Sequence, residues 1–379
     1  MTHVCLGDVA REIKQKVPVD QELPTVGLEH LDPGEVELAH WDEGVKTTFT
    51  KAFSKGQVLF GRRRAYLRKA AVAPFDGICS GDITVIAPKD NLSPRLLPFI
   101  IQNDALFEHA ITNSAGSLSP RVKWQSLSQF EFELPSIAKQ EDLADILWTA
   151  QETRSHYRQL LTACDDVVKS QFVEMFGGPD PTESDCPPVT IGELAADIRY
   201  GTSKKASDSG EFNYLRMNNM TDDGRLDLSD LKYIDLSGAE LENAKVVRGD
   251  LLFNRTNSRE KVGKTCVFNK NEPMVIAGYI VRVRFDERVE PGYVSAFLNS
   301  SYGKGLLRKM AKGAVGQANI SAKEMAKIEL PLPPIELQRS FLDFAASVDK
   351  SKFAVQKALD ELNATTKKIL NQELGLGDV

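Results

Sequence analysis

The feature that most constrains the fold is an internal repeat, because a repeated sequence predicts a repeated structural unit. Three segments recur in the same order: residues 4–10 with 189–195, 55–60 with 248–253, and 134–140 with 332–338. The offset between the copies grows from 185 to 193 and then to 198 residues, as loop insertions in the second copy would produce. A chain of 379 residues is long enough for two domains with cores of their own.

A long helical segment follows the third repeated motif in each copy. No Gly or Pro interrupts it until Gly177 in the first copy and Gly375 in the second, where a glycine C-cap is expected. Each helix is predicted to run about 35 residues, or roughly 50 Å. Apolar residues recur every seven positions, as in a coiled coil: Leu143, Ala150, Tyr157 and Cys164 in the first copy, and Phe341, Val348, Val355, Leu362 and Ile369 in the second. The two helices are therefore expected to pair with each other. A solvated pair that braces neighbouring domains is the alternative to a spacer that holds them apart, and the matched lengths favour the spacer.

The globular part of each copy is predicted to be α+β. Short β-rich runs lie at residues 57–60, 83–86, 251–253, 265–268 and 279–283, and a helical pattern follows at 94–111 and 291–310. The predicted organisation is a first domain at 1–137, its long helix at 138–177, a linker at 178–188, a second domain at 189–334 and its long helix at 335–375.

Charge is distributed unevenly along the chain. The net charge is −6, yet residues 55–69 and 304–312 carry only basic charged side chains. Such patches can hold nucleic acid locally, although the whole chain is acidic. The five cysteines are scattered without a C-x-x-C pair, which fits a reducing cytoplasm. No run approaches about 20 apolar residues, and the N-terminal residues lack a signal-peptide layout, so export and membrane insertion are not expected.

No catalytic motif or metal site stands out. Residues 56–63 have the glycine spacing of a phosphate-binding loop but lack its Lys and Ser/Thr. The histidines show no metal-ligand spacing, and neither Pro-Pro segment has the polar first and aromatic last residue of an amino-methyltransferase motif. Binding is therefore a better interpretation than catalysis.

The candidate binding residues are basic, amide and aromatic side chains in loops, many at matching places of the two copies. Guanidinium groups contact phosphate or guanine, and amide side chains suit adenine. In the first copy the candidates are Arg62, Arg63, Arg64, Tyr66, Arg68, Lys69, Ser119, Arg121 and Lys123. In the second copy they are Lys204, Lys205, Arg255, Thr256, Asn257, Arg259, Lys261, Gln317 and Asn319.

With these residues in view, the chain resembles the DNA-specificity subunit of type I restriction-modification systems. The motifs are residues 4–8, the segment from Gly56 to Lys69, Asn319-Ile320-Ser321, residues 330–334, and the long helices. The resemblance implies two target-recognition domains that each read half of a bipartite asymmetric site in double-stranded DNA. It also implies that the helices form an antiparallel coiled coil. The expected partners are methyltransferase subunits, two of them, and restriction/translocase subunits. S-adenosylmethionine, ATP and Mg²⁺ would be held by those partners.

Two alternatives to a non-catalytic DNA-reading subunit remain at this stage. The chain is either a DNA-modifying enzyme with an unrecognised active site, or a coiled-coil scaffold that does not touch DNA. Turnover by the purified chain alone would indicate the enzyme, and the lack of salt-dependent DNA binding would indicate the scaffold.

Overall fold

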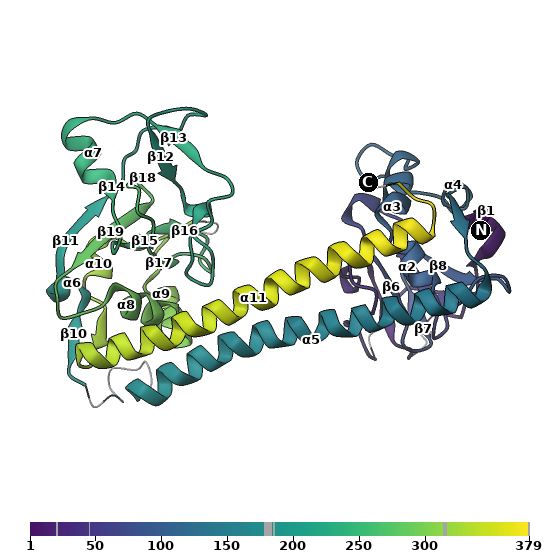
Figure 1. The fold of residues 1–379 in the computed structure, drawn as a ribbon, viewed down its shortest axis with the longest axis horizontal. Helices are drawn as coiled ribbons and strands as arrows, with labels where there is room; N and C mark the ends of the chain where they lie inside the picture. Colours follow the sequence, from purple (N-terminus) through teal and green to yellow (C-terminus); the bar gives the residue numbers. More distant parts are fainter. Residues whose placement is uncertain (20–21, 45, 178–183, 185, 314–316, 378–379) are drawn as a thin grey trace. The chain divides into compact units, whose positions relative to one another are not determined.

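The computed structural model describes residues 1–19, 22–44, 46–177, 184, 186–313 and 317–377, and most of the predicted linker at 178–188 lies outside the described residues. The chain divides into two compact units (Figure 1). The first unit comprises residues 1–160 and 355–379, and the second comprises residues 161–354. The α+β prediction with two related domains, each followed by a long helix, is confirmed.

The described residues of the first unit form three small sheets. A four-stranded antiparallel sheet has the order β2-β8-β5-β6, with β2 at Ala10–Ile13, β8 at Ile83–Pro88, β5 at Val58–Gly61 and β6 at Ala70–Val72. A three-stranded sheet has the order β3-β7-β4, with β3 at Thr25–Val26, β7 at Gly77–Cys79 and β4 at Lys51–Phe53. A two-stranded sheet pairs β1 at Thr2–Cys5 with β9 at Glu131–Leu134.

Both faces of the four-stranded sheet are covered, which explains why its strands are continuously apolar. Successive side chains of a strand point to opposite faces. On β5, Val58 and Phe60 therefore enter one core while Leu59 enters the other. The α-helices of the first unit are α1 at Leu6–Val9, α2 at Leu97–Ile101, α3 at Asp104–Thr112, α4 at Trp124–Leu127, the first part of α5 at Ile137–Phe176 and the last part of α11 at Ile335–Glu373.

The second unit repeats this plan with additions. Its main antiparallel sheet has the order β11-β19-β15-β17, with β11 at Ala195–Tyr200, β19 at Ile280–Phe285, β15 at Leu251–Asn254 and β17 at Thr265–Val267. The other sheet has the order β13-β12-β18-β14, with β13 at Lys232–Ile234, β12 at Phe212–Leu215, β18 at Met274–Ile276 and β14 at Lys245–Val246. Two further pairs are β10 (Pro188–Thr190) with β21 (Glu329–Pro331), and β16 (Thr256–Asn257) with β20 (Ala318–Asn319).

The larger offset in the second copy has a structural cause. The short helices of this unit are α6 at Ile191–Leu194, α7 at Gly238–Ala244, α8 at Pro291–Asn299, α9 at Ser301–Met310 and α10 at Ala322–Met325. Strand β13 and helix α7 lie between the first and second repeated motifs, and the described part of the first copy has no elements in their place. They are part of the inserted chain that raises the offset.

The single helix predicted at 94–111 and at 291–310 is wrong in both copies, because each is broken into two. Asn103 lies between α2 and α3, and its side chain accepts a hydrogen bond from the backbone N–H of Ala105. Ser300 lies between α8 and α9 and caps Gly303 in the same way. Both residues have extended backbone torsions, so a helix N-cap inside the predicted segment starts a new helix.

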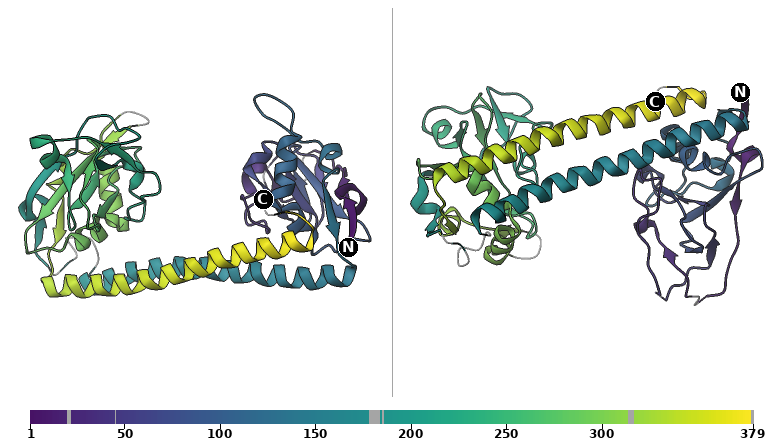
Figure 2. Two further views of the ribbon diagram at one scale, coloured as in Figure 1. Left: turned by 45° about the horizontal axis from the view of Figure 1, so that its top comes forward. Right: turned by 60° about the horizontal axis from the view of Figure 1, so that its bottom comes forward.

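The two long helices are unbroken in all views (Figures 1 and 2). Helix α5 has 40 residues and α11, at Ile335–Glu373, has 39, so both exceed the predicted 35. Gly177 and Gly375 follow them with positive φ, as expected for glycine C-caps. No helix among the described residues has the length and apolarity needed to cross a membrane.

Each unit contains parts of both long helices. In the first unit, Leu143 and Leu147 of α5 belong to the same buried core as Leu370 of α11. In the second unit, the rings of Phe172 of α5 and Phe341 of α11 lie 5.4 Å apart, edge to face. The start of α5 thus shares a core with the end of α11 in one unit, and the end of α5 packs on the start of α11 in the other. Pairing along the whole length, as an antiparallel coiled coil, stays a prediction.

Candidate nucleic-acid interface

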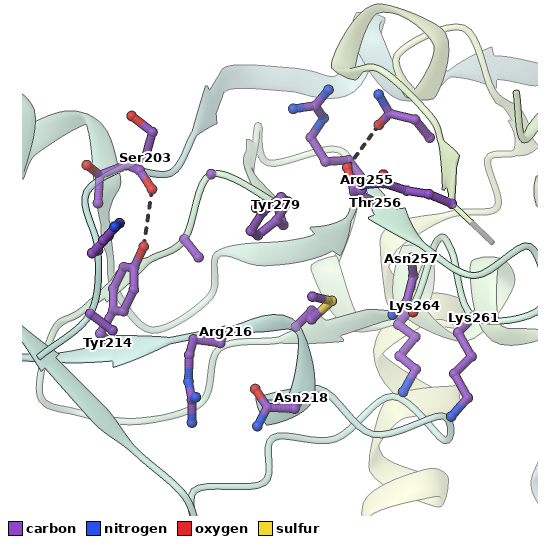
Figure 3. Close-up of a pocket in the computed structure, with 18 of the residues that line it drawn as sticks. Ser203, Tyr214, Arg216, Asn218, Arg255, Thr256, Asn257, Lys261, Lys264 and Tyr279 are labelled. Atoms are coloured by element: carbon purple, nitrogen blue, oxygen red, sulfur yellow. Dashed lines mark hydrogen bonds between the residues drawn. The ribbon is translucent and has the colours of Figure 1, made fainter. Parts of the chain in front are cut away.

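The second unit has a surface hollow of about 1060 Å³ near the ends of its sheets (Figure 3). Three loops that the sequence marked separately meet there. Of the nine candidates in the second copy, the hollow is lined by Lys204, Lys205, Arg255, Thr256, Asn257, Lys261, Gln317 and Asn319. Arg259 is exposed and does not line it.

The charged side chains that line the hollow are all basic. Among the described residues that line it, seven are cationic and none carries a carboxylate; the cations are Lys204, Lys205, Arg216, Arg255, Lys261, Lys264 and Lys312. Four of them are paired with carboxylates outside the lining: Lys204 with Glu240 at 2.7 Å, Arg216 with Asp230 at 2.7 Å, Lys264 with Asp222 at 2.8 Å and Lys312 with Glu324 at 2.6 Å. Lys205 and Lys261 make no ion pair within the part of the chain that the structure describes. The hollow therefore offers polyanions a surface with excess positive charge.

These ion pairs keep the neighbouring carboxyl groups ionised. The Lys312 ammonium, helped by hydrogen bonds from Ser321, lowers the pKa of Glu324 to about 2. Lys204 lowers the pKa of Glu240 in the same manner, with a hydrogen bond from Thr202 as the second cause. The lysines are thus held at the rim of the hollow by partners that stay charged at neutral pH.

At the centre of the hollow, the β16–β20 pair and the backbone hydrogen bonds beside it hold the polar side chains in place, and we call this arrangement the backbone frame. Strands β16 and β20 pair Thr256 with Asn319, and the Thr256 hydroxyl donates to Asn319 Oδ1 at 3.1 Å. Arg255 stacks its guanidinium over the ring of Tyr200 at 5.1 Å. Its Nε is buried and has no hydrogen-bond partner among the residues that the structure describes. The arrangement holds a guanidinium, a hydroxyl and an amide side by side.

Several residues of the hollow were not among the sequence candidates: Tyr214, Arg216, Asn218, Lys264, Tyr279 and Lys312. Tyr279 is half exposed, and in the view of Figure 3 its ring lies between Tyr214 and Arg255. These side chains come from strand ends and turns that meet only when the sheets form. One signal was present, because Tyr279 begins the β-rich run predicted at residues 279–283.

The first unit has the same backbone frame at the equivalent positions. The Val122 N–H donates to the Arg62 carbonyl at 3.0 Å, as the Ile320 N–H donates to the Arg255 carbonyl at 2.9 Å. Arg63 and Arg121 form the bridge that corresponds to Thr256 and Asn319. The shifts between these pairs are 193 and 198 residues, which are the offsets of the second and third repeated motifs.

The side chains mounted on the frame differ in the first unit. Arg63 Nε donates to Ser119 Oγ at 2.8 Å. Asp82, which was not a sequence candidate, accepts from Arg121 at 2.7 and 3.2 Å and from Arg63 at 3.4 Å. The Arg121 guanidinium is the main cause that lowers the pKa of Asp82, so this carboxyl group stays ionised. Two of the predicted residues, Arg63 and Arg121, are therefore brought together around one carboxylate, and a third, Ser119, binds Arg63.

The other candidates of the first unit fall into two groups. Arg64 and Tyr66 are exposed, as is Lys123 at the start of α4. Arg68 instead pairs with Asp104 and Glu108 of α3, and Lys69 donates to the Leu28 carbonyl at 2.8 Å. Arg64 and Arg68 both have a left-handed backbone (φ 55° and 51°), which turns the chain sharply around the short 3-10 helix at Ala65–Leu67.

No group of three or more His, Cys, Asp or Glu side chains that could hold a metal ion occurs in the described part of the chain.

Two copies of one α+β framework, with different polar side chains on equivalent loops, define a duplicated binding protein. A family model described as the type I restriction modification DNA specificity domain matches residues 2–159 and 184–372. The chain belongs to this family, which confirms the resemblance inferred from its motifs.

Curated relatives agree with this assignment. The type I restriction enzyme EcoKI specificity subunit of Escherichia coli (strain K12) is 24% identical over 286 residues, covering 70% of this chain and 62% of the relative. The StySPI specificity subunit of Salmonella potsdam is 21% identical and covers 84% and 72%. The putative MjaX specificity subunit of Methanocaldococcus jannaschii is 25% identical and covers 46% and 42%. The chain thus spans less than two thirds of the length of the EcoKI and MjaX relatives.

Solved structures share the fold. A chain from a structure of type I restriction-modification complex assembly has a TM-score of 0.62 at 20% identity and covers 100% of this chain and 98% of its own. The S subunit of the type I system from M. genitalium has a TM-score of 0.58 at 12% identity and covers 100% and 96%.

Proposed function

We propose that this chain is the DNA-reading subunit of a type I restriction-modification complex and is itself non-catalytic. The observation that carries the proposal is the cationic hollow of the second unit, mounted on a backbone frame that recurs in the first unit. Seven basic side chains without a lining carboxylate suit a phosphate backbone, and the hydroxyl and amide groups between them suit base edges. Membership of the DNA specificity family supports the same function.

Each domain would read one half of a bipartite site, and the long helices would set the gap between the halves. Helices of 40 and 39 residues correspond to roughly 60 Å at 1.5 Å per residue. That length exceeds one DNA turn of about 34–36 Å. Contacts between the helix ends within each unit support an antiparallel pairing along the rest of their length.

The partners follow from the specificity-subunit names of the relatives. Two methyltransferase subunits would dock on the helices, restriction/translocase subunits would join them, and the complex would act in the cytoplasm. S-adenosylmethionine, ATP and Mg²⁺ would be bound by those partners. Apolar side chains that are exposed along the helices, including Ile146 on α5 and Phe353 on α11, are available for docking.

The test is a footprint of the chain assembled with its methyltransferase subunits on duplex DNA. We expect two protected segments separated by an unprotected gap. Arg63→Ala should weaken protection of one segment, and Asn257→Ala should weaken the other. A single continuous footprint, or loss of the same segment in both variants, would contradict the proposal.

A further inference from the structure

We propose that the residue directly before β8 and β19, Asp82 in the first domain and Tyr279 in the second, determines which base each domain reads. In the first domain Asp82 orients Arg63 and Arg121 so that they contact guanine. In the second domain Tyr279 stands at the same place, beside side chains that contact adenine. This inference rests on the proposed DNA-reading function and assigns the chemistry of its two halves.

The two residues occupy the same place in the repeated frame. The Asp82 carbonyl accepts a hydrogen bond from the Arg62 N–H at 3.0 Å, and the Tyr279 carbonyl accepts one from the Arg255 N–H at 2.9 Å. Their strands, β8 and β19, occupy the same position in the strand order of the two main sheets. The frame therefore holds both side chains beside the residues that line each candidate interface, and a change at this place alters the chemistry without altering the fold.

Asp82 leaves some N–H groups of Arg63 and Arg121 free to contact a base. It binds Arg121 through Nε and Nη2, and it binds Arg63 through Nη1, while Ser119 takes the Arg63 Nε. The remaining N–H groups of each guanidinium make no hydrogen bond within the described residues, and the Arg63 and Arg121 side chains are 38% and 43% exposed. A guanidinium held in this way presents paired donors, and paired donors match the O6 and N7 acceptors of guanine in the major groove.

Asp82 also removes the repulsion between the two guanidinium groups. Two positive charges repel each other, which disfavours holding the Arg63 and Arg121 guanidinium groups close together. A carboxylate that both groups bind offsets this repulsion. Because the Asp82 side chain is only 21% exposed, solvent screens this interaction less than it would at an open surface. Asp82 is accordingly a positioning residue: it acts on the base through the arginines.

The second domain carries neutral groups at the same three places. Tyr279 replaces Asp82, Thr256 replaces Arg63 and Asn319 replaces Arg121. The Asn319 amide accepts from the Thr256 hydroxyl, which orients it, and its Nδ2 donors remain unbonded within the described residues. An oriented Asn amide matches the N6 and N7 pattern of adenine. Tyr279 adds an exposed ring that can contact a thymine methyl group or a sugar.

The test uses the full chain assembled with its methyltransferase subunits, acting on a library of randomised duplex DNA whose methylated members are sequenced. Wild type should return a bipartite site with a guanine in one half. Arg121→Gln should reduce discrimination at that guanine by about 5- to 150-fold, the range of one good bidentate contact. Asp82→Asn should relax the same position and leave the other half unchanged, and Asp82→Glu should restore part of the preference.

Tyr279→Ala is the matched variant in the other domain and should change only the second half of the site. If Asp82→Asn lowers methylation equally for all sequences, Asp82 has a structural role alone and the inference fails. It also fails if wild type returns two half-sites and Arg121→Gln changes no base preference. If wild type returns no bipartite site at all, the proposed function itself fails, so the two failures are distinguishable.

Discussion

Gln140 and Gln338 make the same three hydrogen bonds in the two domains. Both side chains are buried at the start of their long helix, and in both Oε1 accepts from one backbone N–H while Nε2 donates to two carbonyls. The partners of Gln140 are Ser93 at 2.8 Å, Asn91 at 3.2 Å and Pro135 at 2.9 Å; those of Gln338 are Glu290 at 2.8 Å, Arg288 at 3.2 Å and Pro333 at 2.8 Å. One amide thus ties each helix to the loop that precedes α2 or α8.

Removing either amide should destabilise one domain selectively. Gln140→Ala leaves buried backbone groups without partners, and we expect a loss of about 2–4 kcal/mol in the free energy of unfolding of the first unit. All three tryptophans (Trp41, Trp124 and Trp148) lie in that unit, so their fluorescence follows its unfolding in urea. Gln338→Ala should leave the fluorescence midpoint close to wild type. The exposed Gln159→Ala is the control, and an equal shift in all three variants would refute the assignment.

Phe341 should hold the end of α5 to the second unit. Its ring is 1% exposed and lies 5.4 Å from Phe172 and 5.5 Å from Phe176. Phe341→Ala should lower the stability of the second unit by about 3–5 kcal/mol, and hydrogen exchange should accelerate in peptides from residues 161–177. Phe353, on the same helix but 74% exposed, is the control, and Phe353→Ala should stay within about 0.5 kcal/mol of wild type. Similar effects of both substitutions would contradict the packing.

Arg68 and Lys261 occupy equivalent positions but should act differently. Arg68 pairs with Asp104 and Glu108, the latter at 2.5 Å, and Asp104 also binds Lys367 of α11 at 2.7 Å. We expect Arg68→Ala to lower the thermal midpoint of the first unit and to leave the salt dependence of DNA binding unchanged. Lys261→Ala should weaken binding to all sequences and reduce the slope of log K against log salt by about 1. A reduced slope for Arg68→Ala would contradict this, because it would indicate that Arg68 contacts a DNA phosphate.

Glu324 should contribute stability that disappears only in strong acid. Its carboxylate accepts from Ser321 and Lys312, and its pKa is lowered to about 2. A lowered folded-state pKa stabilises the protein fully above the unfolded value, and that stability is lost as the pH falls through the folded value. The advantage of wild type over Glu324→Gln should therefore be constant from pH 7 to about 4.5 and vanish near pH 2. Urea unfolding at each pH measures it, with the exposed Glu260→Gln as control. An advantage that is already lost at pH 5 would contradict the ion pair.

Much of the fold could be predicted because the repeat preserved its framework residues. The strands around Leu59 and Leu252 are apolar in both copies, since both faces of each main sheet are covered. The break at Asn103 escaped prediction, because a polar residue on a helix surface and an N-cap look alike in sequence. Only the local hydrogen bond to Ala105 decides between them.

The candidate interface was predicted in part for a similar reason. Lys204, Arg255 and Gln317 were marked by residue type, and the fold brings their loops to one hollow. Asp82 and Tyr279 were missed because the residue types that indicate DNA binding in a sequence are mainly basic and amide side chains in loops. Their importance comes from long-range strand pairing, which places each beside residues some 20 to 40 positions away.

Because each domain packs against parts of both long helices, the order of synthesis affects how the chain folds on the ribosome. Leu370 and Leu374, near the C-terminal end, are buried in the core of the domain that is synthesised first. The Leu374 carbonyl also accepts the Glu133 N–H of β9 at 2.8 Å. The core of the nascent first domain therefore stays incomplete until translation has passed through the second domain, so that both domains reach their final form together.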